Sequence, residues 1–243
     1  MNGVVTAYAP ASPPGATIAA ADMTQHSAPS TQHSPSSPLA LLGGTFDPPH
    51  IGHLFLAECA RLQFGAQTVL FLPAGDPYKK SGSKGSPAGG DSALSTQHSA
   101  LSTPSPAAHR LAMVTLAVAD NPHFAVDDRE TRRPGPSYTV DTLEELHAEG
   151  HTNLILILGA DALADLPTWN QPARILELAT IAVAPNPVVQ NPKSKIQNVA
   201  IEMPPLAISS TLIRARVASG QPIRYLVADS VMTYIRAHNL YTK

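Results

Sequence analysis

Residues Leu39–Leu54 read LALLGGTFDPPHIGHL, which joins a short apolar run, two glycines, a proline turn and a pair of histidines. The apolar run Leu39–Leu42 is typical of a strand that is covered on both faces of a parallel sheet. Gly43 and Gly44 lack Cβ atoms where the chain leaves this strand, so a ligand could approach the backbone closely. Apolar residues then recur at helical spacing over Gly52–Phe64. The segment therefore predicts a strand, a turn and a helix.

The two histidines of this segment are candidates for an anion site. His50 and His53 are three residues apart, so they share a face if both lie on the first turn of the helix. That end of a helix presents free N–H groups and a partial positive charge, which suit an anion. Two imidazoles would add hydrogen-bond donors for phosphate oxygens without a metal. From the spacing alone, a pair of exposed or capping histidines is an equally good explanation.

Composition bounds the class of protein. The chain has 243 residues, of which 43% are hydrophobic and 14% charged, with a net charge of −2. One or two domains with an ample core fit this length, and the charge gives no footprint for nucleic acid. The single Cys59 excludes an internal disulfide and suits a reducing cytoplasm. No apolar run reaches the roughly 20 residues of a membrane span, and the absence of Lys or Arg before Arg61 argues against a targeting peptide.

Two tracts of low complexity stand apart from the rest of the chain. Residues 1–38 are mostly Ala, Ser, Pro and Thr without a period, and we expect a disordered leader there. The tetrapeptide Thr-Gln-His-Ser occurs twice in this leader and once in a second tract at about 81–106. We interpret the second tract as an insertion in a domain that spans 39–243, since loop closure costs only about 0.6 kcal/mol per doubling of length.

Apolar strands alternate with amphipathic helices along this domain. The predicted strands are 39–42, 68–73, 124–126, 153–158, 180–184 and 199–203, and the predicted helices are 52–64, 110–117, 138–148, 209–219 and 227–238. This alternation predicts an α/β fold with one doubly wound parallel sheet. Ligands of such sheets bind beyond the carboxyl ends of the strands. Three strands end at Gly43, near Lys79 and at Gly159, so we expect one composite site at that rim.

The sequence His50–His53, placed after the glycine turn, resembles the signature of the nucleotidylyltransferase superfamily. Within that superfamily the chain is most similar to the bacterial nicotinate-nucleotide adenylyltransferases. Three further motifs carry the resemblance, in the order that the family has: Gly135–Thr139, Gly159–Asp161 with Trp169 following, and Ile208–Arg214. The resemblance covers most of the chain outside the two low-complexity tracts and implies a Rossmann-like sheet.

The resemblance implies an activity, which is adenylyl transfer from ATP to nicotinate mononucleotide. The products would be deamido-NAD and pyrophosphate, within cytoplasmic NAD biosynthesis. The attacking phosphate has a second pKa of about 6 and is already anionic near neutral pH, so no strong base is required. Catalysis then consists of placing two anionic substrates in line and stabilising the charge that develops. Mg²⁺ held mainly by ATP phosphates is implied, because no protein cage for a metal is visible. Whether the protein is a homo-oligomer is left open.

The resemblance also assigns roles to residues of this chain, which together would form a cationic pocket. The catalytic residues would be His50, His53, Lys79 and Arg214. The ATP-binding residues would be Gly43, Gly44, Thr45, Phe46, Ser209, Ser210 and Thr211. The residues that bind the nicotinate nucleotide would be Ser137, Tyr138, Thr139, Asp161 and Trp169.

Several alternatives remain at this stage. The serines at 209–210 are also what a plain helix cap requires, and a lone tryptophan is more often a core residue. The acceptor could be nicotinamide mononucleotide or phosphopantetheine, or the chain could bind a nucleotide without catalysis. Many relatives carry Arg-Pro-Gly after the strand at 180–184, whereas Ala184–Pro187 offers no cation. Selectivity between the acid and the amide acceptor therefore cannot be read from the sequence.

Overall fold

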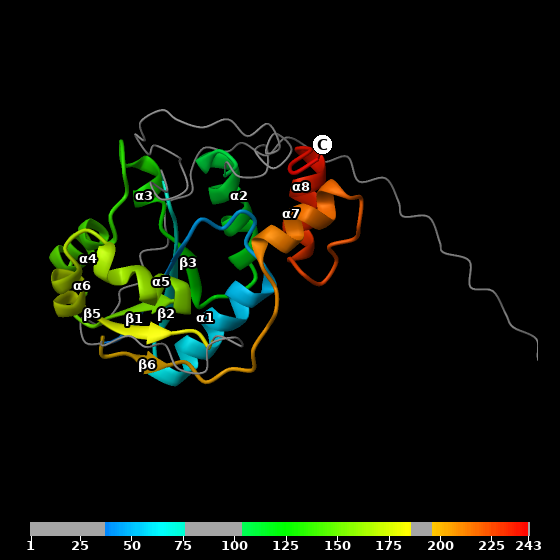
Figure 1. Cartoon of the computed structure of the whole chain (residues 1–243). Coiled ribbons are helices and arrows are strands. Elements are labelled where there is room, and N and C mark those ends of the chain that lie inside the picture. Colours follow the sequence, from blue (N-terminus) through cyan, green and yellow to red (C-terminus); the bar gives the residue numbers. More distant parts are fainter. Residues whose placement is uncertain (1–36, 76–103, 186–195, 243) are drawn as a thin grey trace, which may run out of the picture. The chain divides into compact units, whose positions relative to one another are not determined.

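The structure is a computed structural model, which describes residues 37–75, 104–185 and 196–242 (Figure 1). The expected leader and most of the expected insertion lie outside these residues, as does Lys79. Those expectations stay predictions. The remaining elements of the predicted domain can be compared with the structure directly.

A six-stranded sheet forms the centre of the domain, in the order β3-β2-β1-β4-β5-β6. Its strands are β1 (Leu39–Gly44), β2 (Thr68–Pro73), β3 (Phe124–Val126), β4 (Leu154–Leu158), β5 (Ala179–Val183) and β6 (Val199–Ala200). Every neighbouring pair is parallel. The predicted doubly wound parallel sheet is therefore confirmed, and the strand order changes direction between β1 and β4, where such sheets bind ligands.

Eight α-helices connect or flank the described strands. They are α1 (Ile51–Phe64), α2 (Ala107–Val118), α3 (Arg129–Arg132), α4 (Thr139–Ala148), α5 (Ala160–Asp165), α6 (Pro172–Leu178), α7 (Ser210–Ala218) and α8 (Asp229–Ala237), with a short 3-10 helix, η2, at Leu166–Thr168. The predictions for α1, α2, α4, α7 and α8 fall within three residues of the observed ends. The sequence analysis did not predict α3, α5, η2 or α6. In the described part of the chain no helix has the length and apolar content that a membrane span needs.

Alternate residues of β1 and β4 are buried on opposite faces of the sheet, as the apolar runs predict. Leu41 and Leu156 pack on the side of α4, α5 and α6, together with Leu143. Ala40 and Ile157 pack on the side of α1 and α2. A third cluster joins α2 to α7 and α8, and it holds α7 beside the sheet edge where the site is expected.

The register of the strands brings three loops to one rim. Leu42 of β1 pairs with Ile157 of β4, and Gly44 pairs with Pro73 of β2. The loops that follow β1, β2 and β4 therefore leave the sheet at the same level. This confirms the expected convergence for the described parts of those loops.

Deletion of residues 81–103 is expected to leave the fold intact. The carbonyls of Gly75 and Ser105 accept hydrogen bonds from one guanidinium, that of Arg110, at 2.7 and 2.9 Å, so the two ends of the intervening segment lie close together. Shortening this connection by about two doublings should leave the melting temperature unchanged or raise it by up to about 4 °C.

Thermal unfolding followed by circular dichroism measures this effect. As a control, the deletion is extended through Ser105, whose N–H donates to Asp47 Oδ2 at 3.1 Å and whose carbonyl binds Arg110. The extended deletion should lower the melting temperature. A fall of more than about 8 °C in the shorter deletion would show that residues 81–103 stabilise the domain.

Candidate active site

The loop between β1 and α1 turns sharply at a buried aromatic residue. Phe46 has a left-handed backbone, with φ +50°, and its side chain is only 2% exposed. Its ring lies edge-on to the imidazole of His53, with 5.0 Å between the ring centroids. A Cβ at Gly44 would come within 3.1 Å of the Phe46 ring. Phe46 therefore supports the His53 ring from the core, and Gly44 leaves it the room to do so.

The histidine pair lies at the start of α1. His50 precedes the helix, and its ring stacks on that of His53 with 3.7 Å between centroids and 24° between planes. The backbone N–H of His50 donates to Nδ1 of His53 at 3.1 Å. Because Nδ1 accepts, a neutral His53 ring carries its proton on Nε2. A Cβ at Gly52 would lie 3.0 Å from His50 Nδ1, so glycine between the histidines allows the His50 ring to fold back onto the helix.

Burial of His50 and partial burial of His53 keep both imidazoles neutral. Desolvation lowers the pKa of His50 from 6.5 to about 4. Desolvation also lowers the pKa of His53 well below its usual value, and the nearby charge of a protonated His50 lowers it further. Positive charge in the pocket that the resemblance implies must therefore come from other residues. The pair offers hydrogen-bond donors, and His50 Nδ1 is buried without a hydrogen-bond partner in the described structure.

Helix α7 is tied to the same loop by its first turns. The Ser209 hydroxyl caps α7 by accepting from Leu212 N–H at 3.1 Å, and the Ser210 hydroxyl donates to the Pro48 carbonyl at 2.9 Å. Arg214 Nη1 donates to the Asp47 carbonyl at 2.7 Å, and Nη2 lies 3.4 Å from the Thr211 hydroxyl. The structure therefore brings the residues predicted at 209–214 to the histidine loop. Both serine hydroxyls therefore already form hydrogen bonds within the protein.

Two buried polar atoms near this loop lack partners among the described residues. They are Nδ1 of His50 and Nε of Arg214. A buried polar atom without a hydrogen bond is costly and therefore uncommon, so a pair of them points to a ligand that completes the site. Both nitrogens belong to residues to which the resemblance assigns a catalytic role.

The carboxylate of Asp47 fixes the loop through two residues that are distant in sequence. Its Oδ1 accepts from the Tyr241 hydroxyl at 2.6 Å, and its Oδ2 accepts from the Ser105 backbone N–H at 3.1 Å. Burial and the adjacent carboxylate raise the pKa of Tyr241. The sequence indicates these contacts only through the aspartate in the proline turn, since the partners of Asp47 are distant in sequence.

The residues predicted to bind the acceptor lie on the loops around β4 and α4. Asp161 is exposed on the first turn of α5, which follows β4, and Trp169 is partly buried just after η2. Tyr138 and Trp169 both pack against the core cluster beneath α4 and α6. Thr139 begins α4, and the Ser137 hydroxyl donates to the Glu130 carbonyl at 3.0 Å. Ser137 therefore anchors its loop through its side chain.

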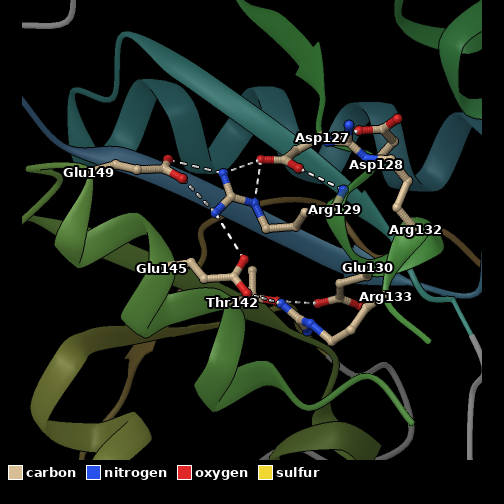
Figure 2. Close-up of polar contacts among 9 residues, drawn as sticks. All are labelled: Asp127, Asp128, Arg129, Glu130, Arg132, Arg133, Thr142, Glu145 and Glu149. Carbon is tan, nitrogen blue, oxygen red and sulfur yellow. Dashed lines mark hydrogen bonds and ion pairs between the residues drawn. The ribbon is translucent and has the colours of Figure 1, made fainter. Parts of the chain in front are cut away.

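An ion network fixes the approach to α4, and the sequence analysis missed it. Figure 2 shows Arg129 of α3 between Asp127 and the two α4-side carboxylates of Glu145 and Glu149. Nη2 of Arg129 lies 2.7 Å from Asp127 Oδ2, and its Nη1 lies 3.1 Å from Glu149 Oε1 and 3.3 Å from Glu145 Oε2. Arg133 lies 2.7 Å from Glu145. The mixed charges at 127–133, together with Glu145 on a predicted helix and Glu149 just after its end, are the signal that could have revealed it.

Glu130 links this network to the loop after β2. Its side chain is 8% exposed and accepts from the Thr142 hydroxyl at 3.0 Å, and burial raises the pKa of its carboxyl group. A Cβ at Gly75 would overlap the Glu130 carbonyl oxygen, so the loop can approach α3 this closely only with glycine at 75. The loop after β2 and the segment before α4 are therefore packed against each other.

Comparison with known proteins shows the family of the chain. The sequence model of the cytidylyltransferase-like family matches residues 41–89 and 89–216. A protein of Roseiflexus sp. strain RS-1 named "Probable nicotinate-nucleotide adenylyltransferase" is 47% identical over 215 residues, which cover 85% of this chain and 98% of that protein. The chain belongs to the nicotinate-nucleotide adenylyltransferase family.

Further relatives of this adenylyltransferase agree. A protein of the same name from Thermomicrobium roseum is 40% identical over 215 residues, covering 84% of this chain and 92% of its own. Among solved structures, Plasmodium falciparum nicotinic acid mononucleotide adenylyltransferase complexed with NaAD has a TM-score of 0.61 at 18% identity. That match covers 84% of this chain and 97% of the Plasmodium chain. The structural likeness shows that the two share a fold.

The lowered pKa of His50 predicts a pH dependence of stability. His50 of the unfolded state takes up a proton near pH 6.5, whereas His50 of the folded state does so only near pH 4. The free energy of unfolding therefore falls as the pH drops from 6.5 to 4. At pH 5 this one group should reduce the free energy of unfolding by about 2 kcal/mol relative to pH 7.5.

Urea unfolding of the wild type and of His50→Gln at these two pH values isolates the effect. The variant should lose less stability than the wild type on acidification, because it removes this proton uptake and relieves His53 of a neighbouring charge. An equal loss in the two proteins would mean that His50 titrates normally in the folded state.

Proposed function

We propose that this enzyme transfers the adenylyl group of ATP to the phosphate of nicotinate mononucleotide, giving deamido-NAD and pyrophosphate in NAD biosynthesis. The observation that carries the proposal is the pair of orphaned buried nitrogens, His50 Nδ1 and Arg214 Nε, at the loop that follows β1. Family membership supports the choice of reaction, since the relatives bear the name of this activity.

The ATP phosphates are proposed to bind at the histidine loop and the start of α7. His53 would donate from Nε2, because its Nδ1 already accepts a hydrogen bond. Arg214 supplies a positive charge that the neutral imidazoles do not. Gly43 is exposed at the end of β1 with open space where a Cβ would lie, so a phosphate can approach the backbone there. The other proposed ATP contacts are Gly44, Thr45, Phe46, Ser209, Ser210 and Thr211.

The chemical step needs positioning more than proton transfer. An oxygen of the acceptor phosphate forms a bond to the α-phosphorus of ATP while the bond to the bridging oxygen of the leaving pyrophosphate breaks. The attacking phosphate is already ionised near neutral pH, so no side chain has to remove a proton. His53 and Arg214 are proposed to stabilise charge on the transferring phosphoryl and leaving groups.

The acceptor is proposed to bind between α4 and the segment after β4. Trp169 would stack on the pyridine ring, and Asp161 would accept from a ribose hydroxyl. Because the Ser137 hydroxyl donates to the Glu130 carbonyl, the donors proposed for the nicotinate carboxylate are the Thr139 hydroxyl and backbone N–H groups of Tyr138 and its neighbours. Such donors at a helix start favour an acid over an amide.

Mg²⁺ is proposed to enter with ATP and to neutralise charge on its phosphates. Among the described residues no group of three His, Cys, Asp or Glu side chains could hold a metal, so ATP oxygens and water would supply most ligands. Lys79, which lies outside the described residues, is proposed to add a second positive charge. A reducing cytoplasm, consistent with the single cysteine, is the proposed location.

Incubation with ATP, Mg²⁺ and nicotinate mononucleotide should release pyrophosphate and form deamido-NAD, measured by a coupled assay and by mass. Nicotinamide mononucleotide and phosphopantetheine, tested side by side, should react at least about tenfold more slowly, because each lacks the carboxylate that the α4 start would bind. Faster turnover of another acceptor would show that the acceptor substrate is not nicotinate mononucleotide. Binding of ATP without turnover of any acceptor would indicate a non-catalytic nucleotide-binding protein.

His53→Ala should lower kcat by about 10²- to 10³-fold, the size expected when one donor to a transition-state charge is removed. His123→Ala is the matched control, since His123 is exposed at the start of β3 and its ring contacts the Gln67 carbonyl at 3.2 Å. The control should retain the wild-type rate. A His53→Ala variant with a near-normal kcat would contradict the role proposed for its Nε2–H.

A further inference from the structure

One arginine is buried at the base of the site although the proposed reaction does not use it. Arg110, on the first turns of α2, is 1% exposed and is among the largest fully buried side chains. Its guanidinium donates to three backbone carbonyls: Nε to Ser105 at 2.9 Å, Nη1 to Thr45 at 3.0 Å and Nη2 to Gly75 at 2.7 Å. A single side chain therefore joins three separate segments.

Each of these segments leads to the proposed site. Thr45 lies in the loop between β1 and the histidine pair, and Gly75 lies in the loop after β2, against α3. Ser105 precedes α2 and donates its N–H to the Asp47 carboxylate at 3.1 Å. The Asp47 carbonyl in turn accepts from Arg214 at 2.7 Å. Arg110 is thus linked, through Ser105 and Asp47, to Arg214, which is proposed to bind phosphate.

Core packing alone does not explain an arginine at this position. Met113 and Val114, three and four residues further on α2, are fully buried apolar residues. An apolar side chain at 110 would continue that face without the cost of burying a guanidinium. The planar fork of donors that arginine provides can reach several carbonyls at once, which a lysine ammonium cannot do in the same geometry.

We propose that Arg110 is a positioning residue of the adenylyl-transfer site, whose guanidinium holds the loops after β1 and β2 in the mutual placement that the reaction needs. The inference rests on the proposed function. Arg110 acts through the backbone of Thr45 and Gly75 and does not touch the substrate. A displacement of about 1 Å in such loops can reduce a rate about 10²-fold.

Steady-state kinetics of Arg110→Met and Arg110→Lys test this role. Arg110→Met should lower kcat about 10²-fold with a change of less than about fivefold in the KM for ATP, because positioning affects the transition state more than ground-state binding. The kcat of Arg110→Lys should lie between those of Arg110→Met and the wild type. If Arg110→Met does not fold, the kcat of Arg110→Lys tests the role by itself. Val114→Ala, one turn away on the same helix, is the control for destabilisation and should keep kcat within about twofold.

Chemical rescue separates positioning from structure. Arg110→Ala should regain at least about tenfold in kcat as millimolar guanidinium fills the cavity, with saturation, while guanidinium should not activate Val114→Ala. A kcat within about threefold of the wild type in Arg110→Met would overturn the inference. An equal loss in Val114→Ala would overturn it too, because the effect would then be one of stability.

A readout that does not need turnover distinguishes this inference from the proposed function. The Ala74 N–H donates to the Gly44 carbonyl at 2.9 Å and reports on the contact between the two loops. Hydrogen exchange at Ala74 should accelerate in Arg110→Lys and remain unchanged in Val114→Ala. If the wild type shows no turnover, the proposed function fails, and the exchange still decides whether Arg110 holds the loops. Unchanged exchange in Arg110→Lys would refute the inference.

Discussion

Backbone carbonyls of the loop between β1 and α1 are held by side chains from remote parts of the chain, and the site depends on these contacts. Arg110 binds the Thr45 carbonyl, Arg214 binds the Asp47 carbonyl and Ser210 binds the Pro48 carbonyl. The loop is followed at once by the stacked imidazoles, so whatever fixes its backbone also fixes their position. Hydrogen bonds from charged donors are stronger than neutral ones, and two of these three donors are guanidinium groups.

The low polarity around the histidines sets the chemistry of the pocket. Neutral imidazoles neither repel one another in their stacked arrangement nor require a counterion in the free protein. They can still donate to a phosphate, and a donor that is already oriented by packing needs little rearrangement when charge develops. Positive charge is then left to Arg214 in the described site, and to Lys79 as proposed. Hydrogen-bond donation and positive charge are thus supplied by different residues of the pocket.

The sequence was sufficient to predict those elements whose buried residues recur at a regular spacing. The runs that form β1 and β4 are apolar on both faces, and α1 repeats its buried positions at helical spacing, so each could be predicted. The helices α5 and α6 could not, because helices of six and seven residues are too short to show a period. Their presence is fixed by packing on the sheet, which is a tertiary effect.

Motif resemblance located the candidate site but not the forces within it. The spacing of His50 and His53 indicated a shared face, whereas the depth of their burial, which decides their charge, depends on residues such as Phe46 folding beneath them. Arg110 was invisible for a different reason. Its partners are backbone carbonyls, and every residue has one, so no side-chain pattern marks them. Its only signal was a charged residue at the start of a buried helical face.

The central claim is that neutral imidazoles in a fixed tautomer bind the phosphates of ATP. Histidine-selective ¹⁵N NMR of the full chain at pH 7, recorded before and after addition of ATP with Mg²⁺ and assigned with single-histidine variants, tests it most directly. The account predicts that free His53 carries its single proton on Nε2 and that this Nε2–H resonance shifts when ATP binds. Imidazolium signals from both histidines in the free protein, or a spectrum that ATP leaves unchanged, would contradict it.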